Sequence, residues 1–287
     1  MHFVDARGIL SAHNGMNMYR GCTHGCIYCD SRSTCYQMKH QFEDIEVKQN
    51  APALLEDALR RKRKKCMIGT GAMCDPYMHC EEELGLTRRC LEIIDRYGFG
   101  LAIQTKSNRV LRDLELLKSI NKKAKCVVQM TLTTYDEELC RILEPNVSTT
   151  RERFETLMTL RENGIPTVVW FSPVLPFIND TEENVHGILQ YCFDAGVVGI
   201  ISYGMGTTIR DGDREYFYAA LDRHFPGMKQ RYIARFGMSY ECQSDNNAAL
   251  MNIFRTECAA RGIIHEPDAV FAYLRDLPEP TQLSLLP

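Results

Sequence analysis

Three cysteines lie within eight positions near the start of the chain, in the stretch YRGCTHGCIYCD. Three residues separate Cys22 from Cys26, and two residues separate Cys26 from Cys29. Three thiolates on one loop can bind three irons of a [4Fe–4S] cluster and leave the fourth iron open for another ligand. Polar residues and a glycine stand between the thiols, so three buried core cysteines are an implausible interpretation.

A structural zinc site is the alternative for the same thiols, with Cys35 or His24 as the fourth ligand. The protein would then be a non-catalytic zinc-binding interaction module. Structural zinc sites usually take paired ligands from two places in the chain, and the sequence has no second C-x2-C pair. Replacing Cys35 by alanine would abolish metal binding only in this zinc case.

The other cysteines, out of 13 in the chain, are scattered. An odd number of cysteines in a long chain without an export signal favours thiols or metal ligation over disulfides. Most of the scattered cysteines lie in apolar surroundings, where a free cysteine behaves as a small buried hydrophobic residue. We therefore expect one iron–sulfur cluster and no second one.

Segments with strand and helix character alternate along the middle of the chain, which predicts βα units around a parallel sheet. No Gly-x-Gly-x-x-Gly follows the first strand, so a dinucleotide-binding sheet has little support. We predict an α/β fold of the partial TIM-barrel, (β/α)6 type, with functional residues on the loops after the strands. The expected strands lie at 17–20, 65–71, 100–106, 125–134, 165–175 and 197–204, and the expected helices at 52–64, 86–98, 109–120, 150–163 and 181–195.

The chain is expected to divide into three parts. Residues 1–205 would form the partial barrel, and residues 206–276 a mostly helical C-terminal extension that packs on it. Residues 277–287 carry three prolines and are expected to form a flexible tail outside the packed body.

The C-x3-C-x2-C motif, with the aromatic Tyr28 before its last cysteine, resembles the signature of the radical S-adenosylmethionine (SAM) superfamily. The resemblance implies that Cys22, Cys26 and Cys29 hold a [4Fe–4S] cluster and that SAM chelates its open iron. One electron would then cleave SAM to methionine and a 5′-deoxyadenosyl radical, which abstracts hydrogen from a substrate. Further segments are similar, in the same order, to the spore-photoproduct-lyase-like branch of that superfamily: 20–32, 69–94, 104–117, 131–154 and 164–180.

Several residues at the ends of the predicted strands are candidates for SAM binding. By the resemblance, Tyr28 would lie near the adenine, and the glycine-rich end of the second strand would bind the amino group. A lysine and a serine after the third strand would meet the carboxylate or a substrate anion. A buried amide on the fourth strand would bind the ribose, and a rigid proline turn after the fifth would line the adenine site. The residues concerned are Gly69, Thr70, Gly71, Ala72, Lys106, Ser107, Gln129 and Pro173.

Cys74 and the pair of Glu144 and Arg153 have two interpretations each. Lesion-repair members of this branch use a cysteine soon after the second strand as a hydrogen donor. Cys74 lies in that neighbourhood but in a different register, so we favour a buried structural thiol. Lesion repair itself is therefore not expected. For Glu144 and Arg153 we favour a structural ion pair.

The substrate is expected to be a nucleic-acid base or nucleotide, in DNA repair or modification, with a peptide or small metabolite as the alternative. The net charge of −3 gives no general basic field, so contact with nucleic acid would need a local patch. Six consecutive basic residues at 60–65 end a helix, where cations are easily solvated. We interpret them as a solvated surface, with phosphate binding as the alternative.

Two kinds of partner are expected. A reducing partner such as flavodoxin or ferredoxin would supply the electron. The pentapeptide QLSLL, from Gln282 to Leu286, resembles the short peptides with which bacterial repair and replication proteins bind the DNA sliding clamp. No stretch of 18 apolar residues and no signal peptide are present, so we expect a cytoplasmic protein without membrane contact.

Overall fold

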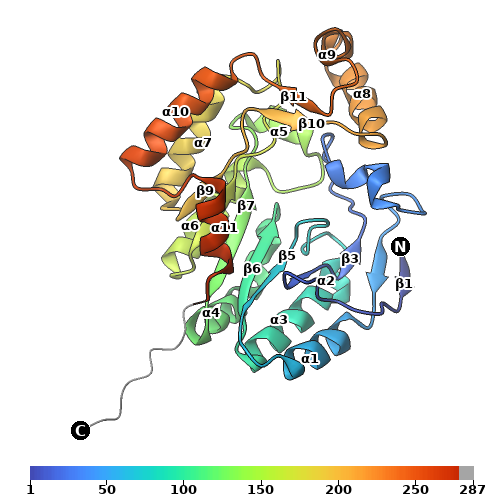
Figure 1. Ribbon diagram of the computed structural model, residues 1–287, viewed down its shortest axis with the longest axis vertical. Coiled ribbons are helices and arrows are strands. Elements are labelled where there is room, and N and C mark those ends of the chain that lie inside the picture. Colours follow the sequence, from blue (N-terminus) through green and yellow to red (C-terminus); the bar gives the residue numbers. More distant parts are fainter. Residues whose placement is uncertain (278–287) are drawn as a thin grey trace.

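Six parallel strands form one sheet at the centre of the computed structural model, which describes residues 1–277 (Figure 1). The strands follow one another in chain order, and every neighbouring pair is parallel. This topology confirms the predicted α/β fold of the partial TIM-barrel type, because each parallel neighbour requires a crossover connection. The strands are β2 (Gly15–Met16), β5 (Met67–Thr70), β6 (Gly100–Thr105), β7 (Cys126–Thr131), β8 (Thr167–Trp170) and β9 (Gly199–Ile201).

Amphipathic helices cover the outer face of this sheet. In α3 the buried residues Leu86, Cys90, Leu91 and Ile94 recur at helical spacing and pack into the main core. The helix α6 begins where the sequence predicts, because the Thr149 hydroxyl accepts a hydrogen bond in the first turn and forms a capping box. The crossover helices are α1 (Ala51–Arg61), α2 (Glu81–Leu84), α3 (Leu86–Tyr97), α4 (Leu114–Lys123), α5 (Glu137–Leu143), α6 (Thr150–Glu162) and α7 (Glu182–Ala195).

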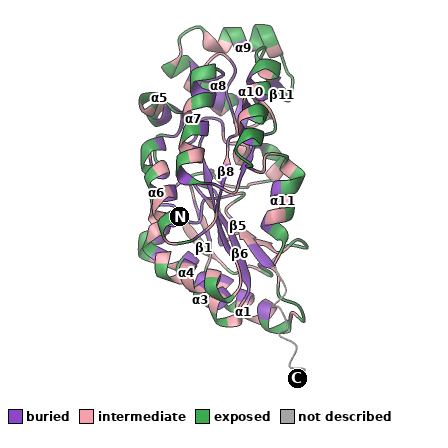
Figure 2. Cartoon of the chain, turned by 90° about the vertical axis from the view of Figure 1, so that its left-hand side faces the viewer, coloured by how far each residue is buried: buried purple, intermediate pink, exposed green. Residues whose placement is uncertain are grey.

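Side chains alternate between the two faces of the sheet, as the two-residue period of a strand requires. Along β7, Val128 and Met130 pack into the core under the outer helices, whereas Val127 belongs to a smaller cluster on the inner face. Figure 2 shows the buried residues along the strands and the exposed residues on the outward sides of the helices. None of the helices within residues 1–277 has the length and apolar character needed to cross a membrane.

The first strand of the sheet differs from the prediction. We expected it around residues 17–20, but the strand that pairs with β5 is β2, at Gly15–Met16. Residues Tyr19–Arg20 form β3, which pairs antiparallel with β4 (Glu46–Lys48) in a separate sheet that also contains β1 (His2–Val4). The strands β2 and β3 are each two residues long. A local sequence pattern cannot tell which of two neighbouring sheets such a short strand joins.

The C-terminal part combines four helices with an antiparallel strand pair, although the sequence predicts mostly helix. Here β10 (Gly206–Thr208) pairs with β11 (Glu241–Gln243). The helices are α8 (Asp213–His224), α9 (Met228–Phe236), α10 (Asn247–Ala260) and α11 (Pro267–Arg275).

This C-terminal part is built into the barrel. Helix α10 packs on α7, and α11 places Val270 and Leu274 against the inner face of the sheet. The backbone of Ile264 also pairs with the edge of β9. The predicted domain boundaries stay predictions, and the segment from Gln282 to Leu286 lies outside the described residues.

Candidate active site

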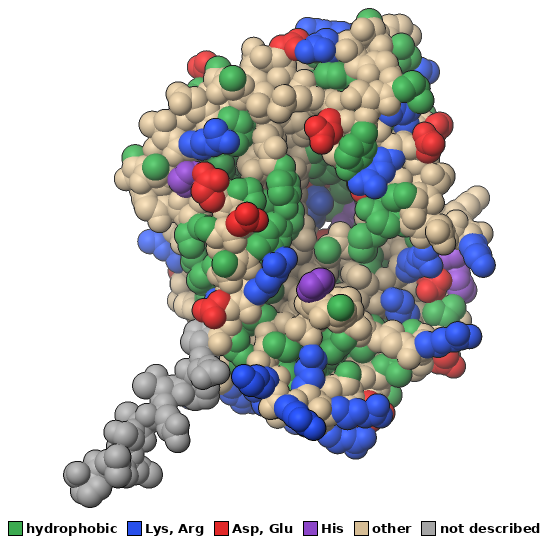
Figure 3. Space-filling model, in the orientation of Figure 1, with side chains coloured by type: hydrophobic (Ala, Val, Ile, Leu, Met, Phe, Trp, Pro, Cys, Tyr) green, Lys and Arg blue, Asp and Glu red, His purple; other side chains and the backbone are tan. Residues whose placement is uncertain are grey.

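A cavity of about 620 Å³ opens at the carboxyl ends of the parallel strands, where the sequence predicts functional residues. Figure 3 shows it as a hollow between the barrel and the C-terminal elements. We call residues 22–29, 71–75 and 104–106 the near wall, because they belong to the barrel. We call residues 203–208 and 240–243, which belong to the C-terminal part, the far wall. Residues of every one of these segments line the cavity.

The three clustered cysteines all line this cavity, and none of them is in a disulfide. Their loop is fixed at its start, where the Cys22 amide donates a hydrogen bond to the Phe42 carbonyl at 3.1 Å. Gly21 makes that approach possible, since it has a φ of 87° and a Cβ there would lie 2.4 Å from the Phe42 oxygen. The glycine before the first cysteine is therefore required by the backbone.

The separation of the thiols bears on the zinc interpretation. Tetrahedral zinc with bonds of about 2.3 Å brings its sulfurs to roughly 3.8 Å from one another. Among residues 1–277, Cys22, Cys26 and Cys29 do not form a group whose sulfurs all lie within 4.8 Å. Cys35 is exposed and accepts a hydrogen bond from Arg210 at 3.5 Å instead. The described residues thus contain no preformed tetrahedral zinc site at these thiols, and the choice between one zinc ion and an iron–sulfur cluster stays a prediction.

Burial keeps these thiols neutral as long as no metal ion is bound. It raises the pKa of Cys26 to about 12, and it raises the pKa values of Cys22 and Cys29 as well. At neutral pH the free side chains are therefore protonated. Each becomes a thiolate when a metal ion replaces its proton, which is the donor chemistry of an iron–sulfur site.

A buried ion pair lies beneath the loop. The Arg153 guanidinium pairs with the Glu144 carboxylate, and the Tyr28 hydroxyl donates a hydrogen bond to the same carboxylate. Arg153 also donates to the Thr131 carbonyl at 2.8 Å and to the Ser148 carbonyl at 2.7 Å, so its buried donors have partners. The favoured structural ion pair is thus confirmed, and it fixes the Tyr28 ring in the cavity wall.

Charges around this pair decide the ionisation of Glu144. Burial alone would keep its carboxyl group neutral, but Arg153 and Lys106 hold the pKa of Glu144 below its usual range. The pKa of the Lys106 ammonium is raised despite burial, by the Cys26 sulfur when it is a thiolate and by the Glu144 carboxylate. Both groups are therefore charged at neutral pH.

Lys106 extends into the cavity, and its ammonium lies 5.9 Å from the centre of the Tyr28 ring. Its backbone amide donates to Asp75 at 2.7 Å, which fixes the end of β6. No group within residues 1–277 accepts a hydrogen bond from the ammonium. A charged donor on a cavity wall without a partner is suited to an anionic group of a bound molecule.

Asp75 organises the neighbouring part of the near wall. Its carboxylate accepts hydrogen bonds from the Thr105 hydroxyl at 2.7 Å and from the Tyr77 amide at 2.8 Å, besides that from Lys106. The His24 ring stands 3.6 Å away, and burial lowers the pKa of this imidazole. The Nε2 atom of His24 is buried without a partner among the described residues, so the cavity wall contains an unused polar atom.

The glycine-rich end of β5 is only partly on the cavity. Gly71 and Ala72 line it, whereas Gly69 and Thr70 do not. The Thr70 hydroxyl lies 3.9 Å from the Met18 sulfur instead. Gly71 has a φ of 98°, and a Cβ there would lie 2.0 Å from the backbone oxygen of the adjacent strand, so no other residue fits.

The remaining predicted SAM residues also divide. Pro173 lines the cavity, whereas Ser107 is buried and does not. The Ser107 hydroxyl caps the turn at 108–113 by accepting a hydrogen bond from the Arg109 amide. Gln129 is buried and accepts a hydrogen bond at 2.9 Å from the indole of Trp170, which does line the cavity. The amide thus has the partner that burial demands, and it fixes an aromatic wall residue. Its assignment to the ribose stays a prediction.

Cys74 lies on the wall, but its thiol is engaged. Its sulfur is 2.9 Å from the Tyr19 carbonyl oxygen, and burial raises its pKa to about 12. This contact agrees with a structural thiol. A further thiol on the cavity wall, that of Cys242, was not among the predicted site residues; Cys242 pairs with Thr207 in the strand pair β10–β11. Three-residue strands in a segment of helical character give little signal, apart from the spaced glycines of SYGMGTT at 202–208.

The segment after the last cysteine is held by a part of the chain far away in sequence. The Thr34 amide donates to the Asp211 carbonyl at 2.9 Å, and Arg210 pairs with Asp30 at 2.9 Å. The basic run at 60–65 lies before β5, at the opposite end of the strands from the cavity. Figure 3 shows basic side chains gathered there, at the lower end of the molecule. This position agrees with a solvated surface.

Comparisons with known proteins show the family of the chain. The sequence model of the Radical SAM superfamily matches residues 16–189, which is more than half of the chain. Uncharacterized proteins of Mycobacterium tuberculosis and Mycobacterium bovis are 30% identical over 230 residues, 76% of this chain and 65% of theirs. An uncharacterized protein of Methanocaldococcus jannaschii is 34% identical over 169 residues, 58% of this chain and 62% of that protein. The chain thus spans less than two thirds of the length of these relatives.

Solved structures show the same fold. Spore photoproduct lyase complexed with dinucleoside spore photoproduct superposes with a TM-score of 0.64 at 12% identity, covering 92% of this chain and 80% of the lyase. A mutant of that lyase with bound AdoMet and dinucleoside spore photoproduct gives a TM-score of 0.62 at 13% identity, covering 88% and 75%. With the superfamily match over more than half of the chain, we conclude that the chain belongs to the radical SAM superfamily.

Proposed function

We propose that this enzyme binds a [4Fe–4S] cluster through Cys22, Cys26 and Cys29 and binds SAM beside it in the same cavity. The observation that carries the proposal is the content of the near wall. Three free thiols share it with the Lys106 ammonium and with Nε2 of His24, neither of which has a hydrogen-bond partner within residues 1–277. These are the donors that a cluster and a zwitterionic ligand need.

The bound cofactors would supply a 5′-deoxyadenosyl radical, formed by one-electron cleavage of SAM. The chain's own residues bind and orient. Lys106 donates to the SAM carboxylate, and the backbone at Gly71 and Ala72 receives the amino group. Tyr28, fixed by Glu144, and the backbone at Pro173 bound the space for the adenine. A reductant such as flavodoxin or ferredoxin would deliver the electron.

The substrate that we propose is a nucleic-acid base or nucleotide. Tyr203 and Tyr240 on the far wall are 63% and 43% exposed, and Trp170 stands on the cavity wall between the strand ends and this side. Exposed aromatic rings at a cavity mouth suit a planar base, and such stacking contributes about 1–3 kcal/mol per base. The dinucleoside ligand bound to spore photoproduct lyase supports the same substrate class. Its lesion-repair reaction is not part of the proposal.

The test begins with protein purified without oxygen, reconstituted with iron and sulfide, and reduced with dithionite. After SAM is added, 5′-deoxyadenosine is measured by mass spectrometry. We expect it from the wild-type chain and not from Cys26→Ala. No 5′-deoxyadenosine from iron-loaded wild-type protein would contradict the proposed chemistry.

The same assay then tests the substrate. We expect single-stranded oligodeoxynucleotides to increase the rate of 5′-deoxyadenosine formation, and deuterated oligonucleotides to pass deuterium from a base or sugar to the 5′-deoxyadenosine. If only peptide or small-metabolite mixtures increase the rate, the substrate belongs to the alternative class and not to nucleic acids. Such an outcome would leave the SAM chemistry intact.

A further inference from the structure

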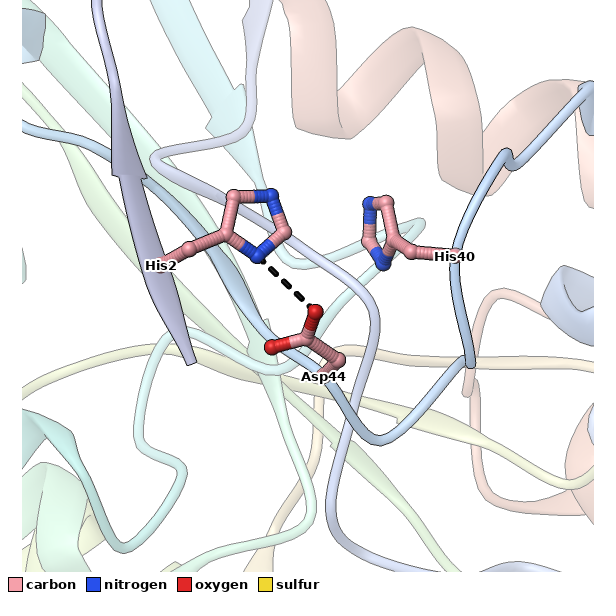
Figure 4. A group of neighbouring side chains, drawn as sticks. All are labelled: His2, His40 and Asp44. Carbon is pink, nitrogen blue, oxygen red and sulfur yellow. Dashed lines mark hydrogen bonds and ion pairs between the residues drawn. The ribbon is translucent and has the colours of Figure 1, made fainter.

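A group of two imidazoles and one carboxylate lies outside the cavity. His2 is on β1, and His40 and Asp44 belong to the segment that precedes β4 (Figure 4). One ligand atom from each residue lies within 4.8 Å of the other two. All three side chains are half-buried, so the group is neither a solvated surface cluster nor a sealed core contact.

The hydrogen bonds in this group leave donor atoms for a cation. His2 Nδ1 lies 3.0 Å from Asp44 Oδ2, and the rings of His2 and His40 are 4.7 Å apart. His40 Nδ1 lies 3.0 Å from the Gln41 carbonyl, which only accepts, so Nδ1 carries the proton of the neutral ring. His40 Nε2 is then a lone pair, and its neighbour at 3.6 Å is the Glu46 carboxylate.

Two acceptors that face each other require a positive charge between or beside them. His40 Nε2 is buried and has no hydrogen-bond partner among the described residues. A proton on His40 Nε2 would compensate the charge of the Glu46 carboxylate only. A metal ion would satisfy both imidazoles and the carboxylates of Asp44 and Glu46 together, since each of these groups can act as a ligand or orient one.

We propose that His2, His40 and Asp44 bind one divalent transition-metal ion of the zinc type. Imidazole with carboxylate is a donor set that such ions prefer, and three protein ligands leave a position for water or for Glu46. The second oxygen of Asp44 pairs with the Met1 amine at 2.6 Å, so Oδ2 is the oxygen that faces the site.

This ion would act on the radical site from a distance. It would join β1 to the segment 37–45, whose Phe42 carbonyl holds the Cys22 amide at 3.1 Å. A metal ion that fixes this segment would therefore stabilise the start of the cluster loop. The ion itself would lie outside the cavity, because neither histidine nor Asp44 lines it.

The experiment is a titration of the full chain with Zn²⁺ by isothermal calorimetry, without oxygen and with the cluster loaded so that the thiols are occupied. A parallel titration uses Cys22→Ser/Cys26→Ser/Cys29→Ser/Cys35→Ser, which removes the three clustered thiols and the exposed Cys35 thiol and does not depend on the proposed function. The wild-type chain should bind one equivalent. Because a ligand is lost, His40→Gln should bind at least about tenfold more weakly.

The matched control is His186→Gln. His186 pairs with Glu257 at 2.8 Å on the surface, and it belongs to no metal-binding group within residues 1–277. It should bind Zn²⁺ as the wild-type chain does. If His40→Gln fails to fold, His2→Gln provides the same test. Absence of zinc binding to the wild-type chain, or unchanged affinity in both variants, would overturn the proposal.

Discussion

Buried polar groups hold the near wall of the cavity, whereas exposed aromatic side chains form much of the far wall. On the near wall, Asp75 accepts three hydrogen bonds, and the ion pair of Glu144 and Arg153 lies fully buried beneath the cysteine loop. On the far wall, Tyr203 and Tyr240 are 63% and 43% exposed.

The difference separates two tasks. Cluster and SAM need donors in fixed positions, and a network of satisfied buried groups fixes them before any ligand arrives. A substrate can be exchanged in evolution by altering exposed residues beside a short strand pair, at little cost in stability. Near-wall changes should therefore affect the common chemistry or the fold, and far-wall changes only the response to substrate.

The largest expected effect belongs to the thiols. Cys26→Ser should lose nearly all cluster iron and all 5′-deoxyadenosine formation, because one iron loses its protein ligand. The matched control is Cys35→Ser, whose exposed thiol contacts Arg210 and should leave both unchanged. Iron and sulfide per chain are measured after anaerobic reconstitution. Equal iron loss in the two variants would show that the near wall extends to Cys35 and would revive a four-thiol site.

Arg153→Met should be the next most severe change. It leaves the Glu144 carboxylate buried without its partner, which costs about 3–5 kcal/mol of unfolding free energy. Urea unfolding measures the loss. Arg151→Met is the matched control on the same helix, since its exposed pair with Glu155 at 2.9 Å contributes about 0.5 kcal/mol or less.

The pH dependence sharpens this prediction. Because Arg153 and Lys106 depress the pKa of Glu144, the ionised carboxylate stabilises the fold above its unfolded pKa of about 4.3. That contribution is lost as the pH falls below this value and through the folded one. The deficit of Glu144→Gln relative to wild type should therefore shrink below about pH 4. A deficit that stays constant with pH would mean that the charge is not what matters.

Lys106→Met should mainly weaken the binding of SAM. Loss of one charged hydrogen bond to the carboxylate lowers affinity roughly tenfold to a hundredfold. Calorimetry with SAM and cluster-loaded protein measures it. Lys125→Met is the control, because its ammonium donates to the Tyr273 carbonyl at 2.6 Å, away from the cavity. An unchanged SAM affinity in Lys106→Met would reassign this ammonium to the substrate.

The smallest effect is expected on the far wall. Tyr203→Ala should lower the oligonucleotide-dependent rate about fivefold to tenfold through lost stacking. The unfolding free energy should stay within about 0.5 kcal/mol of wild type. The rate of 5′-deoxyadenosine formation with SAM alone should be unchanged. Met238→Ala, at an exposed apolar residue that does not line the cavity, should change neither rate. A loss of the SAM-only rate in Tyr203→Ala would erase the distinction between the walls.

The two walls also differ in how well the sequence predicts them. The near wall follows from local signals: the cysteine spacing, the glycines that its turns require, and strands whose carboxyl ends must meet in a parallel sheet. The far wall depends on the pairing of β10 with β11, in which Thr207 lies opposite Cys242. These two strands have three residues each and are distant in sequence. No local pattern encodes such a contact, and for the same reason β2 was placed a few residues too late.

The contact between Thr34 and Asp211 has a consequence for how the enzyme is made. About 180 residues separate Cys29 from Asp211, and at typical synthesis rates the ribosome needs on the order of ten to forty seconds to add them. During that interval the cysteine motif emerges from the ribosome. The segment around Asp211, which later binds the downstream end of the motif, has not yet been synthesised. The downstream end of the cysteine loop therefore reaches its final contacts only after the C-terminal part has been synthesised.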